Sequence, residues 1–199
     1  MAKKKSNKVK EEGKVVSRSS ELVSTLKKLS DDKIGSILSM DGLVDKTIPK
    51  TSSGILSFDL ALCGGFPHGR LIEIFGPEMS GKTTATLHAI ASVQQRGGVC
   101  AFVDAEHSLD LSYAEKLGVN VNELVIQQPD YGEQAFEAVI SIAERMRPGD
   151  MIVVDSVDAL IPKKELDGEL LDPNMGLKPL MMGRGVKKSN TVVAKHGVI

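Results

Sequence analysis

The chain has 199 residues, of which 41% are hydrophobic and 26% are charged, and its formal net charge at pH 7 is −1. This length suits one sizeable domain with a small addition, and the composition excludes a fibrous or largely disordered chain. No apolar run approaches the ~18 residues of a membrane helix, and we find no apolar core of a signal peptide. We therefore expect a cytoplasmic protein that has no membrane partner.

The cysteines and the N-terminal residues allow further expectations. Cys63 and Cys100 lack metal-type spacing, so we predict two reduced thiols in or near the core. Residues 1–18 are basic and low in apolar content, which predicts a disordered, solvated tail. The alternative is that this tail makes salt-sensitive contacts with nucleic-acid phosphates.

Residues 19–47 are predicted to hold a short amphipathic helix followed by a linker. One apolar stripe of this helix consists of Leu22, Val23, Leu26 and Leu29. A helix this short cannot bury the stripe by itself. We expect it to dock on the main domain, predicted at residues 48–199, or on a neighbouring subunit.

Residues 71–84 are the most informative stretch. Residues 71–75 are mostly apolar and predict a buried strand, and residues 84–96 have helical spacing that ends at two glycines. Between them stands a full match to the phosphate-binding pattern G-x-x-x-x-G-K-[ST]. The matching residues are Gly76, Pro77, Glu78, Met79, Ser80, Gly81, Lys82 and Thr83.

This pattern predicts a site for a nucleoside triphosphate and Mg²⁺. Backbone N–H groups can surround phosphate oxygens only where no Cβ obstructs the turn, which explains Gly76 and Gly81. The positive end of the following helix faces the same phosphates. Lys82 supplies a charge to the β- and γ-phosphates, and the Thr83 hydroxyl is a ligand for Mg²⁺.

Three further strands are predicted at residues 99–104, 124–127 and 151–155, with helices between them at 109–117 and 130–147. This alternation predicts an α/β fold with a mostly parallel sheet and helices on both faces. Residues 163–188 are polar and contain several glycines and prolines, so we expect a flexible segment. A fifth strand is predicted to begin at residues 191–194.

Acidic residues follow two of the predicted strands, where ligands bind in parallel sheets. Asp155 is a candidate to hold Mg²⁺, and the alternative is that it caps the next turn. Glu106 is a candidate to activate water, and the alternative is a surface glutamate. For His107 we favour packing or hydrogen bonding over catalysis. Tyr113 either stacks on a nucleotide base or belongs to the core.

Five phrases in one order resemble the bacterial RecA recombinase family. They are GPEMSGKTT at residues 76–84, FVDAEHSLD at 102–110, YAEKLGV at 113–119, QPDYGEQA at 128–135 and IVVDSVDALIPK at 152–163. The resemblance covers residues 51–182 and implies a RecA-like ATPase core. It also implies an ATP-dependent recombinase that binds single-stranded DNA and pairs it with homologous duplex DNA.

The resemblance assigns further partners and residue roles. It implies filaments of identical subunits, action in DNA repair and the SOS response, and promotion of SOS repressor self-cleavage. By position, Thr84 joins the phosphate-binding residues, Asp155 with Ser156 forms the Walker B end, and Asp110 and Tyr113 meet the adenine. A first DNA-binding loop is implied near residues 169–175. Its candidate DNA-binding residues are Glu169, Asn174, Met175, Gly176 and Lys178.

The sequence departs from the family pattern after residue 176. Leu180 stands in place of an arginine, and Pro179 is expected to disfavour helical geometry at Lys178, which supplies a replacement charge. The basic helix expected at residues 183–188 is shortened. The following strand lacks its terminal glutamine, and the second DNA loop and C-terminal domain have no counterpart. We therefore expect weak ATP binding and little DNA-stimulated turnover. The alternative function is that of a truncated, non-catalytic RecA-like remnant or filament regulator.

Overall fold

The computed structural model describes residues 48–169 and 175–199. The chain divides into two units, Met1–Thr47 and Ile48–Ile199. The predicted basic tail, the N-terminal helix and its linker lie outside the described residues. The same holds for residues 170–174, which include the candidate DNA-binding residue Asn174.

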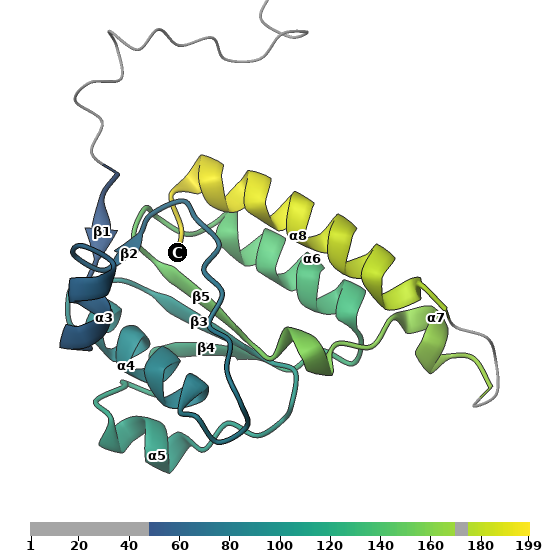
Figure 1. The fold of residues 1–199 in the computed structure, drawn as a ribbon, viewed down its shortest axis with the longest axis horizontal. Helices are drawn as coiled ribbons and strands as arrows, with labels where there is room; N and C mark the ends of the chain where they lie inside the picture. The colour runs from purple at the N-terminus through teal and green to yellow at the C-terminus, as the bar shows by residue number, and fades with distance from the viewer. Residues whose placement is uncertain (1–47, 170–174) are drawn as a thin grey trace, which may run out of the picture. The chain divides into compact units, whose positions relative to one another are not determined.

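A parallel sheet of three strands forms the centre of the second unit (Figure 1). The strands are β3 (Cys100–Asp104), β4 (Leu124–Gln127) and β5 (Met151–Asp155), in the order β4-β3-β5. Cys100 lies opposite Leu124 on one side and Met151 on the other. All five residues of β3 are buried, as expected for the central strand of a parallel sheet. The predicted α/β class is confirmed.

Helices cover both faces of this sheet. α4 (Lys82–Gln94) and α5 (Leu111–Lys116) lie on one side in Figure 1, and α6 (Gly132–Ala143) and α8 (Leu177–His196) lie on the other. Because successive side chains of a strand point to opposite faces, Phe102 packs with the α4 residues and Val103 packs with Val139 and Met181. α4 is followed by Gly97 at φ 79°, so the predicted glycine stop is confirmed.

Smaller elements complete the unit. β1 (Lys50–Thr51) pairs antiparallel with β2 (Phe66–Pro67), and α3 (Leu56–Ala61) lies between them in the chain. A 3₁₀ turn, η2 (Val157–Ala159), follows β5 and leads to α7 (Lys163–Leu166). The prediction of a flexible segment at 163–188 was wrong, because α7 and more than half of α8 fall within it.

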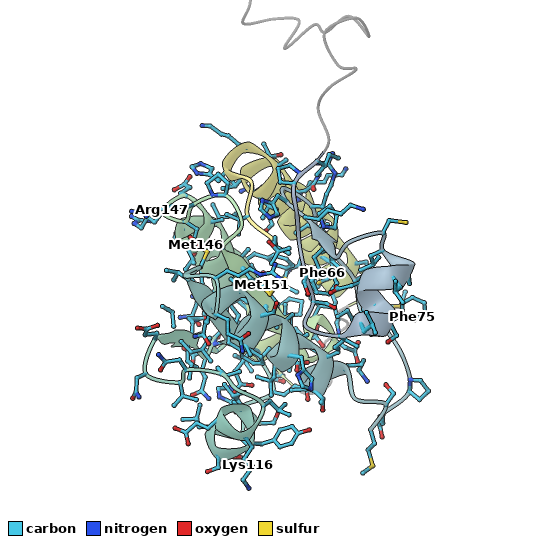
Figure 2. All side chains as sticks on the ribbon, turned by 90° about the vertical axis from the view of Figure 1, so that its left-hand side faces the viewer. Phe66, Phe75, Lys116, Met146, Arg147 and Met151 are labelled. Carbon is cyan, nitrogen blue, oxygen red and sulfur yellow. The ribbon has the colours of Figure 1, made fainter. Side chains whose placement is uncertain are left out.

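The strand predicted at residues 71–75 does not form. Leu71, Ile72 and Phe75 are exposed, and Figure 2 shows Phe75 at the periphery while Phe66 and Met151 lie inside. The free edge of β5 is instead occupied at one end by Ile199, whose N–H donates to the Asp150 carbonyl while its own carbonyl accepts from Ile152. Strand-forming residues make a strand only with a partner, and residues 71–75 have none in the described sheet.

The fifth strand predicted at residues 191–194 is part of α8. Met181, Gly185, Ser189 and Val193 are buried at intervals of four residues, which is one face of a helix. A Cβ added to Gly185 would overlap the Phe136 ring, so α6 and α8 are in close contact at this glycine. This packing outweighs the β-propensity of the Thr-Val-Val run.

Lys178 is helical although Pro179 follows it, contrary to prediction. α8 begins at Leu177, so Pro179 is its third residue. The first four N–H groups of a helix have no intrahelical acceptor, and the missing N–H of proline therefore costs no hydrogen bond here.

The two cysteines differ in their surroundings. Cys100 is buried, and burial raises the pKa of its thiol to about 12, which makes it unreactive. Cys63 is exposed, so its predicted place in or near the core was wrong. None of the helices within residues 48–169 and 175–199 is both long and apolar enough to cross a membrane.

Candidate nucleotide-binding site

The candidate phosphate-binding loop, residues 76–81 (the phosphate loop below), leads directly into α4. Gly81 is the residue before the helix and has φ 88°, a conformation that favours glycine. Residues 76–81 are all exposed, including Glu78 and Ser80, and the Met79 side chain is fully exposed. The N-terminal end of α4, with its free N–H groups, therefore opens toward an accessible loop.

Lys82 and Thr83 begin α4 and face different partners. The Lys82 ammonium donates to the carbonyl oxygens of Gly76 at 3.2 Å and Pro77 at 2.9 Å, so it lies across the loop. The Thr83 hydroxyl donates to Asp155 Oδ2 at 2.6 Å. This contact joins residues 72 positions apart and places the end of β5 beside the start of α4.

The Thr83–Asp155 pair fits a Mg²⁺ site. Mg²⁺ prefers oxygen ligands and usually keeps several waters, with one or two protein ligands and phosphate oxygens completing the octahedron. A hydroxyl and a carboxylate in contact provide such protein ligands. Within the described ranges there is no cluster of three or more His, Cys, Asp or Glu side chains suited to a metal, so an all-protein metal cage is not formed there.

Glu106 lies in the turn after β3 and contacts the residue after Asp155. The Ser156 hydroxyl donates to Glu106 Oε1 at 2.5 Å. The Ala105 N–H donates to the Asp155 carbonyl at 2.8 Å, which extends the contact between β3 and β5 to the turn. The structure thus brings Glu106, Asp155 and Ser156 together at the carboxyl ends of neighbouring strands.

Asp104 is the last residue of β3, and no role in the site was assigned to it from the sequence. Its side chain is only 1% exposed and accepts hydrogen bonds from the backbone N–H groups of Ser108 and Leu109 and from the Gln128 amide. Burial alone would raise the pKa of Asp104, but these hydrogen bonds outweigh it, and the pKa is lowered. An acidic residue ending an apolar strand was the available signal.

The candidate adenine residues lie at the start of α5. Asp110 is the N-cap of this helix, and its carboxylate accepts the N–H of Tyr113 at 3.0 Å. The Tyr113 hydroxyl lies 3.1 Å from Thr84 Oγ1, which places the half-exposed ring beside the first turn of α4. His107 is exposed and has φ 54°.

The candidate DNA-binding residues are only partly described. Met175 is exposed, and Gly176 is the N-cap of α8 with φ 84°. Lys178 forms a salt bridge with Asp158 at 3.3 Å and also donates to the Asp158 carbonyl. The start of α8 is therefore tied to the 3₁₀ turn that follows Asp155 and Ser156. Glu169 lies at the edge of the described residues.

The comparisons with known proteins agree with this geometry. A family model described as the RecA N-terminal domain matches residues 20–199. Protein RecA of Listeria monocytogenes serotype 4a (strain HCC23) is 49% identical over 166 residues, which cover 83% of this chain and 47% of that protein. This chain belongs to the RecA family. The resemblance predicted from the sequence is confirmed.

Other RecA proteins show a similar extent of likeness. Protein RecA of Desulforapulum autotrophicum is 48% identical over 162 residues, and that of Brevibacillus brevis is 50% identical over 166 residues. These alignments cover 81% and 83% of this chain, but 46% and 47% of the two RecA proteins. The chain thus spans about half the length of the curated relatives it matches.

Proposed function

We propose that this chain binds ATP with Mg²⁺ and hydrolyses it to ADP and phosphate, as part of a RecA-type recombinase that acts in homologous recombination and DNA repair. The contact between Thr83 and Asp155, beside the turn that carries Glu106, is the observation that carries this proposal. It unites the phosphate loop with the strand ends where in-line attack on a γ-phosphate is arranged in such enzymes.

The chain's own residues supply most of the chemistry. Loop N–H groups and the α4 N-terminus bind the phosphates, and Lys82 leaves the Gly76 and Pro77 carbonyls to reach the β- and γ-oxygens. Thr83 and Asp155 would hold Mg²⁺, which would supply positive charge against the phosphate oxygens. Glu106 orients a water and accepts its proton as the water oxygen bonds to the γ-phosphorus and the bond to the bridging oxygen of ADP breaks.

We propose that the adenine lies near α5. Tyr113 offers an exposed aromatic face beside Thr84, and Asp110 lies at the adjacent helix start. Aromatic faces stack on nucleotide bases without requiring a particular sequence of donors. In this arrangement α4 contacts both ends of one nucleotide.

DNA binding is proposed for the α8 side of the domain. The 20 residues of α8 contain no aspartate or glutamate, and four exposed cations stand on it. They are Arg184, Lys187, Lys188 and Lys195. Such a surface favours the phosphates of single-stranded DNA, and its affinity is expected to fall with salt. Lys178, paired with Asp158, connects this helix to the end of β5.

The remaining parts of the proposal rest on family membership. They are pairing with homologous duplex DNA, assembly into filaments, promotion of SOS repressor self-cleavage and a place in the cytoplasm. Affinity for ATP is expected to be low, because residues 71–75 leave the phosphate loop without a strand to anchor it. Ordering such a loop on binding costs conformational entropy.

The test is ATP turnover with and without single-stranded DNA. We expect slow but measurable hydrolysis that single-stranded DNA increases only slightly, and we expect Lys82→Ala to abolish it. Lys164→Ala is the matched control, because Lys164 is an exposed lysine on α7, away from the loop. Binding of Mg·ATP without any hydrolysis, with or without DNA, would contradict the proposal and favour the non-catalytic alternative.

A further inference from the structure

The turn that carries Glu106 is fastened to a buried side chain. Asp104 Oδ1 accepts the N–H of Ser108 at 3.2 Å, and Oδ2 accepts the N–H of Leu109 at 3.3 Å. These two N–H groups belong to residues that follow Glu106 and His107 in the turn. The carboxylate at the end of β3 therefore fixes the far side of the turn.

Gln128 in addition holds the Asp104 carboxylate in place. It follows β4 directly, and its Nε2 donates to Asp104 Oδ2 at 3.1 Å. Gln128 is exposed, whereas the Asp104 carboxylate that it contacts is buried. A buried carboxylate is stable only when its oxygens have hydrogen-bond donors. Among residues 48–169 and 175–199, Gln128 supplies the one side-chain donor, and the turn itself supplies the two backbone donors.

The near side of the turn is fixed by β5. The Ala105 N–H donates to the Asp155 carbonyl at 2.8 Å, and Ser156 donates to Glu106 itself. Between the two anchors, His107 adopts φ 54°, which costs a non-glycine residue about 1 kcal/mol or more. Such a conformation persists only where the surroundings hold it. Residues at the carboxyl ends of all three strands thus hold the turn that carries Glu106.

We propose that Asp104 and Gln128 are a positioning pair that sets the direction of Glu106 toward the water it activates. This rests on the proposed function, in which Glu106 is the catalytic residue. Neither member of the pair is assigned a contact with ATP or Mg²⁺. Their removal therefore affects the chemical step and leaves nucleotide binding intact.

The first test is Gln128→Ala in the full chain, with two measurements. Hydrogen exchange reports the Ser108 and Leu109 amides, and single-turnover hydrolysis reports the chemical step. We expect exchange at these two amides to become about five- to tenfold faster, since one supporting hydrogen bond is lost. We expect hydrolysis to slow by about 10- to 100-fold while affinity for a non-hydrolysable ATP analogue changes by less than about twofold.

Gln94→Ala is the matched control. Gln94 also fixes a loop with its side chain, because it donates to the Asn120 carbonyl and accepts the Asn120 N–H. It lies at the opposite end of α4 from Lys82, about 18 Å along the helix. A general loss of rigidity would appear in both variants, whereas loss of positioning would appear only in Gln128→Ala.

Two more variants grade the effect. Gln128→Glu places a second carboxylate against Asp104, so the turn should loosen more than in Gln128→Ala. Asp104→Asn keeps the shape of the side chain but weakens its hydrogen bonds to the two N–H groups.

Unchanged exchange at the Ser108 and Leu109 amides in Gln128→Ala would contradict the proposal that Asp104 and Gln128 hold the turn. Faster exchange with unchanged hydrolysis would overturn its positioning role. A wild-type protein without hydrolysis would contradict the proposed function, while the exchange data would still decide whether the pair holds the turn.

Discussion

The two sides of the candidate site are built in different ways. On one side, Asp104, Glu106 and Asp155 stand at the ends of paired parallel strands and are held by several hydrogen bonds. On the other side, the phosphate loop follows residues 71–75, which pair with no described strand and are mostly exposed. The carboxylates are thus fixed before nucleotide binds, whereas the phosphate cradle depends on α4 alone. The expected consequence is weak nucleotide binding at a site where the turn that carries Glu106 is already held in place.

The largest effect is expected from removing the carboxylate that joins the two sides. Asp155→Ala removes both the partner of Thr83 and the proposed Mg²⁺ ligand, so hydrolysis should fall by about 100- to 1,000-fold. Turnover measured over a range of Mg²⁺ concentrations checks this. Asp167→Ala, an exposed aspartate after α7, is the control and should leave turnover unchanged. Full activity of Asp155→Ala at low Mg²⁺ would contradict the proposal that Asp155 at the end of β5 acts together with the phosphate loop.

The next effect concerns α6 and α8, the two helices that cover one face of the sheet (Figure 1). Gly185→Ala forces a methyl group into the Phe136 ring, and overpacking of this kind costs about 1–3 kcal/mol. Urea unfolding measures the loss in the free energy of unfolding. If Gly185→Ala is as stable as the wild type, then α6 and α8 do not pack as closely as described.

A neighbouring glycine provides the opposite expectation. Gly183 also lies in α8, but a Cβ there would meet no atom within 4 Å. Gly183→Ala should therefore stabilise the protein by about 0.5–1 kcal/mol through helix propensity alone. The same urea experiment measures it. Equal destabilisation by Gly183→Ala and Gly185→Ala would contradict the assignment of only one of them to the α6 contact.

Much of the side of the site that is built on β3, β4 and β5 could be predicted from the sequence. The prediction of a flexible segment at residues 163–188 failed. β3, β4 and β5 were predicted because each apolar run is bounded by turn residues or ends in a polar one. Residues 71–75 and 191–194 have equally good strand composition, yet the first range has no regular secondary structure and the second is helical. Composition does not show whether a segment has a neighbouring strand to pair with. It also does not show that the Phe136 ring packs directly against Gly185. The Gln128–Asp104 contact spans 24 residues and has no local signal.

The smallest expected effect is on how the free energy of unfolding depends on pH. The pKa of Asp104 is lowered from its ordinary value of 3.8 in the folded protein, so its contribution is fully present above that value and is lost as the pH falls through the lowered pKa. Urea unfolding at pH 7 and pH 3 should show a smaller drop for Asp104→Asn than for the wild type. The pKa of Asp59 is also lowered, mainly by its hydrogen bond from Ser52, so the drop does not vanish. Equal drops would exclude a lowered pKa at Asp104.

The most direct measurement is hydrogen exchange across the site, with and without Mg·ATP analogue. Without nucleotide, we predict fast exchange at residues 71–81 and slow exchange at residues 100–104 and at the Ser108 and Leu109 amides. With nucleotide, we predict new protection at residues 76–84 and little change at the turn that carries Glu106. Protection that appears elsewhere and not at the loop, or a turn that exchanges fast until nucleotide binds, would contradict a site with one fixed and one unanchored side.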